Sequence, residues 1–294
     1  MDWFCQFLNY IEYEKQFSPK TYTAYKTDLE QYFNFLSNRE KEIKKATHQD
    51  IRAWIIDELE RGKTSKTVNR KISSLKAFYK FLCKNKYILT NPTTKLIVPK
   101  QKKSLPIFVS ETDMNHLFER IDFGDTFEGI RDKTIIELFY ATGIRLSELL
   151  NIKRKDIDFY TYTIKIIGKR KKERIIPFSP KLLSILNEYI AVYENEFGEF
   201  GQNMFLFTTK EGKIMYPKLI YKIVRKYLDM VSTVEKRSPH VLRHTFATHL
   251  LDNGADLSAI KEILGHSSLS ATQFYTHTSV ERLKKTYKQA HPRA

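Results

Sequence analysis

The stretch SPHVLRHTFATHL, residues 238–250, predicts a helix whose start and buried side can both be placed. Ser238 is a good N-cap, and Pro239 suits the first helical position, where its missing N–H costs no hydrogen bond. Three apolar residues then recur four positions apart, which places them on one side: Leu242, Phe246 and Leu250. The stretch therefore predicts a helix over 239–251 that packs along this apolar seam.

The first turn of that helix gathers groups that bind anions. His240 and Arg243 are three residues apart and share a face. The backbone N–H groups and the positive end of the helix dipole lie beside them, which outlines a phosphate pocket. Zinc is the alternative, because His240 and His244 are four apart, as on metal-binding helices. No acidic or cysteine ligand stands nearby and His249 is out of phase, so we expect no metal and no cofactor.

Upstream, the block YATGIRLSELL, residues 140–150, joins two helices. Gly143 marks the junction, and Arg145 and Glu148 follow three residues apart on one face. Taken alone, the block predicts an ordinary ion pair at a helix corner.

Downstream, the block LGHSS, residues 264–268, ends another helix. Gly265 has the position of a left-handed C-cap, so His266 is expected to stand at a corner. Tyr275 follows nine residues later. A single tyrosine or histidine is normally part of a core or a surface, so neither residue is informative alone.

The composition narrows the class of protein. No apolar run in the 294 residues approaches the ~20 residues of a membrane span, and the first residues lack the pattern of a signal peptide, so we expect a cytoplasmic protein. Cys5 and Cys83 are too few for a disulfide framework and are expected to be buried thiols. The net charge of +16 favours a polyanionic partner.

The positive charge is concentrated in the first third of the chain. Residues 1–103 hold 21 basic and 11 acidic side chains, a net +10. Within them, residues 66–82 predict a helix that is apolar on one side and basic on much of the remainder, which suits packing on a core while facing phosphates. With two lysines further on, the candidate DNA-binding residues are Lys66, Arg70, Lys71, Lys76, Lys102 and Lys103.

The chain divides into two parts around a linker. Amphipathic helical patterns fill residues 1–90 and include a helix over 21–36 that begins at Ser18-Pro19. Residues 91–106 contain three prolines and little periodicity, which is typical of an extended linker. Residues 107–294 form the second part, with a basic, amphipathic tail at 280–294.

The second part is mainly helical but contains one β-rich stretch. Residues 160–178 predict two strands around the basic turn GKRKK, residues 168–172, and therefore a hairpin. Helical patterns account for most of the remainder: 111–121, 131–140, 181–193, 218–231, 239–251 and 257–264. The expected fold is mainly α with a small β-sheet.

These blocks, taken in order, resemble the tyrosine recombinases, the λ-integrase-like family, and most closely their Xer branch. The order is Arg145, Lys169, His240-x-x-Arg243, His266 and Tyr275. The resemblance covers the whole chain, from Ser18-x-x-Thr21-x-x-x-Tyr25-x-x-Asp28-Leu29 and Asn91-Pro92 to the terminal His291-Pro292-Arg293-Ala294. Single blocks are weak signals, but six in order at family-like spacing are highly specific. The resemblance implies a SAM-like helical core-DNA-binding domain over 1–90 and an α+β catalytic domain over 107–294.

The resemblance also implies a role for each residue of the series. Tyr275 is the nucleophile, and it attacks a DNA phosphodiester to form a 3′-phosphotyrosyl intermediate. Arg145 and Arg243 bind the nonbridging oxygens, because the planar guanidinium fork matches that geometry. His266 donates a further hydrogen bond to a nonbridging oxygen.

Three more residues would complete the chemistry. The phenol has an ordinary pKa of ~10 and needs a proton acceptor, for which His240 is the candidate. Lys169 on the hairpin would protonate the leaving 5′ oxygen. Glu148 would orient Arg145 or His240.

The partners follow from the same resemblance. They are double-stranded DNA with two half-sites, further recombinase subunits in a homo- or hetero-tetramer, and an accessory activator protein. The implied function is Xer-type resolution of chromosome or plasmid dimers, which would serve chromosome partition and cell division. The tail at 280–294, with Leu283 and Tyr287 on one helical face, is expected to dock on a neighbouring subunit.

Two alternatives stand beside this interpretation. An integrase of a phage or mobile element shares the catalytic domain, although such enzymes often carry an additional arm-binding domain for which this chain has no room. A non-catalytic DNA-binding protein is the other, because residues 253–275 have the outline of a helix-turn-helix. That alternative leaves Arg145, Lys169, Arg243 and Tyr275 unexplained.

Overall fold

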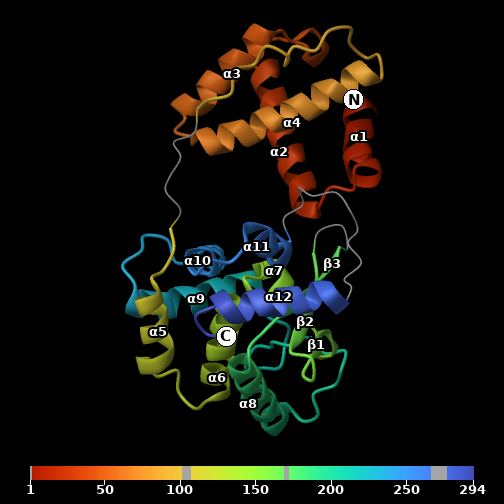
Figure 1. The fold of residues 1–294 in the computed structure, drawn as a ribbon. Coiled ribbons are helices and arrows are strands. Elements are labelled where there is room, and N and C mark those ends of the chain that lie inside the picture. The colour runs from red at the N-terminus through yellow and green to blue at the C-terminus, as the bar shows by residue number, and fades with distance from the viewer. Residues whose placement is uncertain (1, 101–106, 169–171, 266–276) are drawn as a thin grey trace. The chain divides into compact units, whose positions relative to one another are not determined.

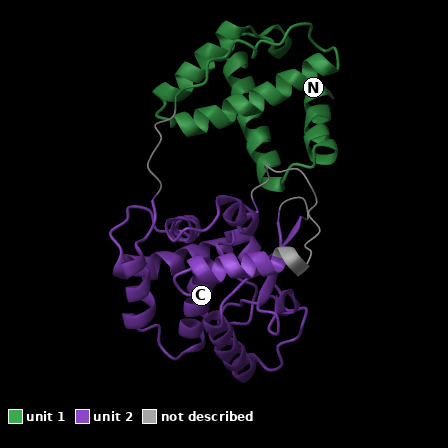
Figure 2. Cartoon of the chain, in the orientation of Figure 1, with its two compact units in different colours: residues 1–104 green, residues 105–294 purple. Residues whose placement is uncertain are grey.

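The computed structural model describes residues 2–100, 107–168, 172–265 and 277–294. The chain forms two compact units, residues 1–104 and residues 105–294 (Figure 2). Each unit has a hydrophobic core of its own.

The first unit consists of helices packed around buried aromatic rings. Over residues 2–100 its α-helices are α1 (Asp2–Asn9), α2 (Pro19–Ser37), α3 (His48–Glu60) and α4 (Ser65–Lys84), shown in Figure 1. A π-helical turn, Tyr10–Glu14, follows α1, and a short 3-10 turn, Ile43–Lys45, precedes α3. The largest buried side chains include Trp54, Tyr32, Tyr79 and Phe78.

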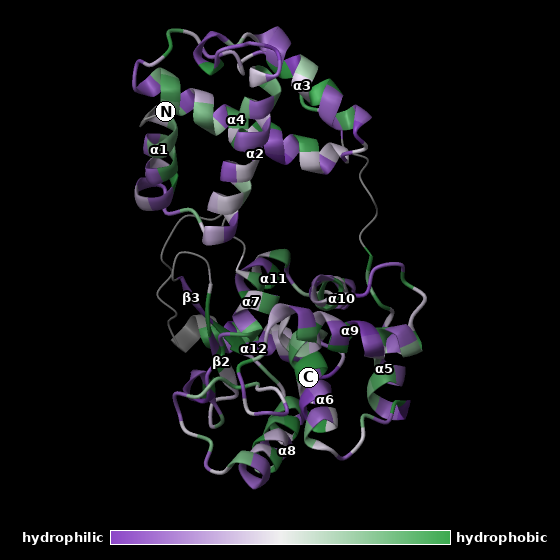
Figure 3. Ribbon diagram, turned by 180° about the vertical axis from the view of Figure 1, so that it is seen from behind, coloured by the Kyte–Doolittle hydropathy of each residue, from purple (hydrophilic) through white to green (hydrophobic). Residues whose placement is uncertain are grey.

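Helix α2 begins as the sequence predicts. The Ser18 hydroxyl accepts a hydrogen bond from the backbone N–H of Thr21 at 3.2 Å, and Pro19 occupies the first helical position. Purple and green segments alternate along α2 and α4 in Figure 3, the pattern of helices with one polar and one apolar side. The buried residues of α2 are Asp28, Leu29, Tyr32, Phe33 and Leu36.

The structure of helix α4 corrects the prediction for one of the candidate DNA-binding residues. Lys66, Arg70 and Lys76 are exposed as expected, but Lys71 is only 3% exposed. Its ammonium pairs with the equally buried Glu58 at 2.6 Å. Both α2 and α3 pack on α4, so more than the apolar side of this helix is covered and Lys71 does not lie on its basic exposed face. The candidates Lys102 and Lys103 lie outside the described residues.

The structure also differs from the predictions for the linker and for the two thiols. Residues 91–100 belong to the first unit, where Leu96 is buried in the core and the Asn69 side chain donates to the Pro99 carbonyl at 3.0 Å. The rest of the predicted linker, 101–106, lies outside the described residues. Cys5 is exposed and Cys83 partly exposed, so the prediction of buried thiols is wrong, although both are free.

The second unit packs helices around a small sheet. Strands β1 (Ile157–Asp158), β2 (Thr163–Ile167) and β3 (Glu173–Pro177) are antiparallel in the order β1-β2-β3, with Ile164 opposite Ile176. The predicted hairpin is therefore confirmed, and β1 adds a strand to it. The helices are α5 (Glu111–Arg120), α6 (Phe127–Thr142), α7 (Leu146–Leu149), α8 (Pro180–Phe197), α9 (Pro217–Val231), α10 (Pro239–Asp252), α11 (Leu257–Leu264) and α12 (His277–Ala290).

Helix α6 is the centre of this unit. Nearly every one of its residues is buried, so it has no polar face, and it packs against α8 on one side and α10 on another. The apolar seam predicted for α10 is confirmed, because Leu242, Phe246 and Leu250 are all fully buried. No helix in the described ranges is long and apolar enough to cross a membrane.

The C-terminal tail packs on its own catalytic unit. Leu283 and Tyr287 are buried on the inner face of α12, which contacts β3, α10 and α11 (Figure 1). Beyond the helix, the Arg293 guanidinium donates to both carboxylate oxygens of Glu137 at 2.7 and 2.9 Å, and His291 Nε2 lies 3.1 Å from the Tyr140 carbonyl oxygen. In this single chain the tail therefore packs in cis, and docking on a neighbouring subunit stays a prediction.

Burial explains why the tail stays on its own unit. The Glu137 side chain on α6 is 1% exposed, and burial raises the pKa of its carboxyl, so the ionised form depends on Arg293. An unpaired carboxylate at this depth would be strongly unfavourable. The tail thus supplies the countercharge of the central helix.

Removing that countercharge should destabilise the second unit. We expect Arg293→Met to lower the free energy of unfolding by about 3–5 kcal/mol, because it leaves Glu137 buried and unpaired. The double variant Arg293→Met with Glu137→Met should recover most of the loss. Arg282→Met is the matched control, since Arg282 is 60% exposed and its pair with Glu262 should be worth about 1 kcal/mol or less. Urea unfolding of the full chain measures all three, and equal losses for Arg293→Met and Arg282→Met would contradict the assignment.

Candidate active site

A glycine brings the corner between α6 and α7 against α10. Gly143 ends α6 in the left-handed conformation, with φ of 58°. A Cβ at this position would lie 2.4 Å from a ring carbon of Phe246, so no larger residue fits. The next residues of the chain, Ile144 and Arg145, are consequently placed at the first turns of α10.

Arg145 is held by Glu148, as the sequence predicts. Its Nη1 donates to Glu148 Oε1 at 2.7 Å, and its backbone N–H donates to Glu148 Oε2 at 2.8 Å. The other end of the guanidinium, Nη2, donates to the Gly265 carbonyl at 3.1 Å. The side chain of Arg145 is 30% exposed, so this fork is still open to solvent on one side.

Arg243 reaches the same place from α10. Its Nη1 donates to the Gly143 carbonyl and its Nη2 to the Leu264 carbonyl, both at 2.6 Å. Burial and the neighbouring positive charge of Arg145 lower the pKa of Arg243 to about 10, which still leaves it protonated at neutral pH. The structure thus brings together the two predicted phosphate-binding arginines.

A third arginine, Arg174 on β3, completes the group and was not among the predicted site residues. It donates to both oxygens of Glu148 at 2.8 and 2.7 Å, and its Nε donates to the Ile263 carbonyl at 2.7 Å. The sequence does contain a signal for it, because alternation along β3 places this basic residue at an inward position. An arginine at such a position requires a buried acidic partner.

The three arginines share one anchor at the end of α11. The successive carbonyls of Ile263, Leu264 and Gly265 each accept from a different guanidinium, those of Arg174, Arg243 and Arg145 in turn. The last carbonyls of a helix have no partner within it and form its negative end, so they attract cations. The predicted left-handed cap at Gly265 is confirmed, with φ of 64°.

Glu148 is the single carboxylate among these cations. Burial alone would raise the pKa of its carboxyl, but the hydrogen bonds and charges of Arg174 and Arg145 outweigh burial and hold this pKa at about 2. The carboxylate is therefore ionised at all physiological pH values. It neutralises only part of the positive charge, and the group remains a strong attractor for an anion.

The other predicted site residues divide into two sets. His240 is exposed in the first turn of α10 and has no hydrogen bond to any described residue. Ser238 stands at the N-cap position as predicted, but its side chain caps nothing, so that detail is wrong. Lys169, His266 and Tyr275 lie outside the described residues.

The comparisons with known proteins agree on the family. Residues 107–282 match the model of the phage integrase family, and residues 4–86 match the model of its N-terminal SAM-like domain. The tyrosine recombinase XerC of Chlorobaculum parvum is 37% identical to this chain, over 99% of it and 95% of the relative. The tyrosine recombinase XerC of Bacillus subtilis is 38% identical over 98% and 95%.

Solved structures show the same fold. A XerH recombinase bound to palindromic difH substrate superposes with a TM-score of 0.72 at 23% identity, covering 90% of this chain and 78% of that one. The Tn1549 transposon integrase in complex with transposon right-end DNA gives 0.71 at 23% identity, covering 96% and 98%.

The chain therefore belongs to the phage integrase family, the tyrosine recombinases. Within that family it is a site-specific recombinase of the Xer branch. The non-catalytic helix-turn-helix alternative is set aside, and the predicted fold class, a SAM-like helical domain followed by an α+β catalytic domain, is confirmed.

The Glu148 carboxylate should give the second unit a measurable acid sensitivity. Its pKa of about 2 in the folded chain is below the ordinary 4.5, so its stabilising effect is complete above pH 4.5 and is lost as pH falls towards 2. The shift corresponds to about 3 kcal/mol. In Glu148→Gln this part of the pH dependence is absent, so the stability difference between wild type and variant should shrink by about that amount between pH 6 and pH 2. Urea unfolding at a series of pH values measures it, and two parallel profiles would refute the pairing.

Proposed function

We propose that this recombinase cuts and rejoins DNA through Tyr275. The observation that carries the proposal is the convergence of Arg145 and Arg243 on the carbonyls of Leu264 and Gly265, at the end of α11. Two preorganised guanidinium forks at one point suit the nonbridging oxygens of a phosphate under attack. The chain leads from this point directly to His266 and, nine residues later, to Tyr275.

The reaction is a transesterification. The Tyr275 oxygen attacks phosphorus, the bond from phosphorus to the 5′ oxygen breaks, and a 3′-phosphotyrosyl ester forms. His240 accepts the phenol proton, and its exposed position at the start of α10 leaves it accessible for that step. Lys169 gives a proton to the leaving 5′ oxygen. The ester keeps the energy of the broken bond, so a 5′-hydroxyl of another strand can reverse the attack without ATP.

The electrostatic part of catalysis rests on the arginines. Extra negative charge develops on the nonbridging oxygens in the pentacoordinate state. Arg145 and Arg243 meet it without reorganising, because both guanidiniums are already held by hydrogen bonds to carbonyls and, for Arg145, to Glu148. Glu148 pairs with both Arg145 and Arg174, and this pairing holds Arg145 in position. His266 supplies an additional donor.

The biological role proposed here is Xer-type resolution of chromosome or plasmid dimers in the cytoplasm. It is supported by full-length similarity to XerC recombinases at 35–39% identity. The substrate would be duplex DNA with two half-sites, bound by a tetramer of this chain alone or with a second recombinase, with an accessory activator. The alternative is an integrase of a mobile element, and the observation in its support is the similarity of fold to the Tn1549 transposon integrase. Sequencing the DNA bound in cells separates the two, since a chromosomal dimer-resolution site and element ends are different loci.

Replacing the nucleophile tests the reaction. Tyr275→Phe should retain binding to target DNA and form no covalent protein–DNA adduct on a nicked substrate, because only the attacking oxygen is removed. Tyr160→Phe is the matched control, an exposed tyrosine in the same unit that should form adduct normally. If Tyr275→Phe still forms an adduct, the nucleophile is another residue.

Metal removal tests the assignment of charge stabilisation to arginines. Since Arg145 and Arg243 supply the positive charge, adduct formation should continue at an unchanged rate in excess EDTA. If EDTA abolishes activity and added Mg²⁺ or Zn²⁺ restores it, a metal shares this role.

A further inference from the structure

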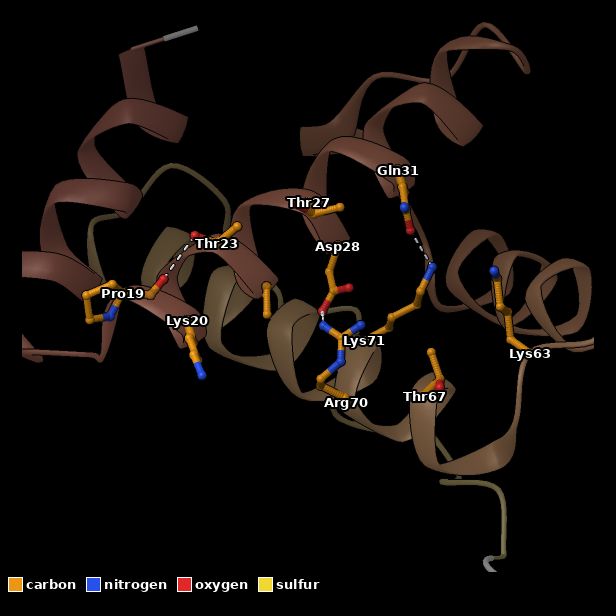
Figure 4. A pocket seen from close by; sticks show the side chains of 11 residues that line it. Pro19, Lys20, Thr23, Thr27, Asp28, Gln31, Lys63, Thr67, Arg70 and Lys71 are labelled. Atoms are coloured by element: carbon orange, nitrogen blue, oxygen red, sulfur yellow. Dashed lines mark hydrogen bonds and ion pairs between the residues drawn. The ribbon is translucent and has the colours of Figure 1, made fainter. Parts of the chain in front are cut away.

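An open pocket of about 580 Å³ lies between α2 and α4 on the first unit (Figure 4). Its lining is polar and basic, and apart from Lys63 all of it comes from these two helices. The residues are Pro19, Lys20, Thr23, Ala24, Thr27, Asp28, Gln31, Lys63, Thr67, Arg70 and Lys71.

The exposed side chains of α2 follow one face of the helix. Lys20, Thr23, Thr27 and Gln31 are spaced by three or four residues and all are exposed, so they form a polar stripe about 16 Å long. Lys63 and Arg70 add positive charge beside it. The one carboxylate in the lining, Asp28, is 1% exposed and already bound by Arg70 and by Ser74 Oγ, the latter at 2.8 Å. The pocket therefore presents net positive charge with hydrogen-bonding groups between the cations.

Lys71 holds the floor of the pocket. Its Nζ donates to Glu58 Oε2 at 2.6 Å and to Gln31 Oε1 at 2.5 Å, and it lies 5.2 Å from the centre of the Trp54 ring. Three partners thus fix a buried ammonium group, and the bond to Gln31 is drawn in Figure 4.

This ammonium decides which way the Gln31 amide faces. A lysine ammonium carries only donors, so the amide atom that meets it must be the oxygen. Gln31 is itself exposed, and with its oxygen turned to the floor its NH₂ group is the part available to a ligand. Gln31 therefore turns its NH₂ donors towards a ligand while its oxygen faces the floor, whereas a freely rotating glutamine offers a donor and an acceptor together.

The difference matters in the major groove of DNA. A free glutamine pairs best with adenine, accepting from N6–H and donating to N7. A group with donors only cannot accept from N6–H, and it matches guanine, whose N7 and O6 are two adjacent acceptors. The cations beside the stripe, Lys20, Lys63 and Arg70, are groups that bind the phosphates bordering such a groove.

We propose that Gln31 is a specificity-determining residue that reads a guanine in the major groove of the target half-site, with Lys71 as the positioning residue that fixes its amide. The inference rests on the proposed function, because it requires duplex DNA as the substrate. A helix in the major groove would place the stripe of α2 along the base edges, with Lys20 and Lys63 towards the backbone.

In vitro selection from random-sequence duplex DNA tests the proposal with the full-length chain. The wild type should select a site with guanine at one position that depends on Gln31. Gln31→Ala should lose roughly 5- to 100-fold of the preference for guanine at that position and keep the rest of the selected sequence. Gln202→Ala, an exposed glutamine of the second unit, is the matched control and should select the wild-type sequence.

The role of Lys71 needs a variant that does not strand a buried charge. Lys71→Met alone leaves Glu58 unpaired, so it is combined with Glu58→Met, which should preserve the fold as followed by circular dichroism. In this double variant the Gln31 amide is free to turn, and the preference at the same position should move from guanine to adenine. A purely structural role of Lys71 would weaken binding without changing which base is chosen.

A modified base gives an independent measurement. Replacing the selected guanine by 7-deazaguanine removes the N7 acceptor, and affinity should fall for the wild type but not for Gln31→Ala. Unchanged base preference in Gln31→Ala overturns the assignment of Gln31, and an unchanged guanine preference in the double variant overturns that of Lys71. If the wild type still forms adduct while either result holds, the proposed function stands and this inference alone fails. If the wild type selects no sequence and forms no adduct, both fail.

Discussion

The Glu148 carboxylate and the guanidiniums around it organise the catalytic unit. A buried charge is tolerated only when it is paired and hydrogen-bonded, and Glu148 meets that requirement with Arg174 on one side and Arg145 on the other. Because Arg174 also binds the Ile263 carbonyl, this network ties β3, α7 and the end of α11 together. The position of Arg145 is consequently set by three elements at once. A charge network that looks like stabilisation also determines where Arg145 lies.

A second constraint is the close approach of backbone segments at this point. The lack of a side chain at Gly143 allows the start of α7 to approach Phe246 of α10. Gly265 packs in a similar way against the Arg174 side chain, where a Cβ on the glycine would lie 3.1 Å from Cδ of the arginine. The carbonyls exposed by these turns become acceptors for the arginines. Close packing and the positions of Arg145 and Arg243 therefore depend on the same two glycines, and neither glycine could be replaced without affecting both.

Local signals in the sequence predicted much of this structure. The start of α2, the hairpin, the left-handed cap at Gly265 and the seam of α10 all follow from the identities of nearby residues, and so does the Arg145–Glu148 pair three positions apart. The failures concern contacts between distant segments. Arg174 meets Glu148 across 26 residues, and the burial of Lys71 depends on two other helices packing on α4. Periodicity describes one helix at a time and cannot say how many neighbours cover it.

The pairing of Glu137 with Arg293 bears on how the catalytic unit is made. The two residues are 156 positions apart, so on a ribosome adding about 5–20 residues per second the carboxylate is synthesised on the order of ten seconds before its partner. During that interval the central helix carries a charge that it cannot bury. The first unit is complete well before this and folds from contacts of its own. Assembly of the catalytic unit is thereby coupled to the synthesis of its last helix, and in a nascent chain the first unit is complete before the catalytic unit can be.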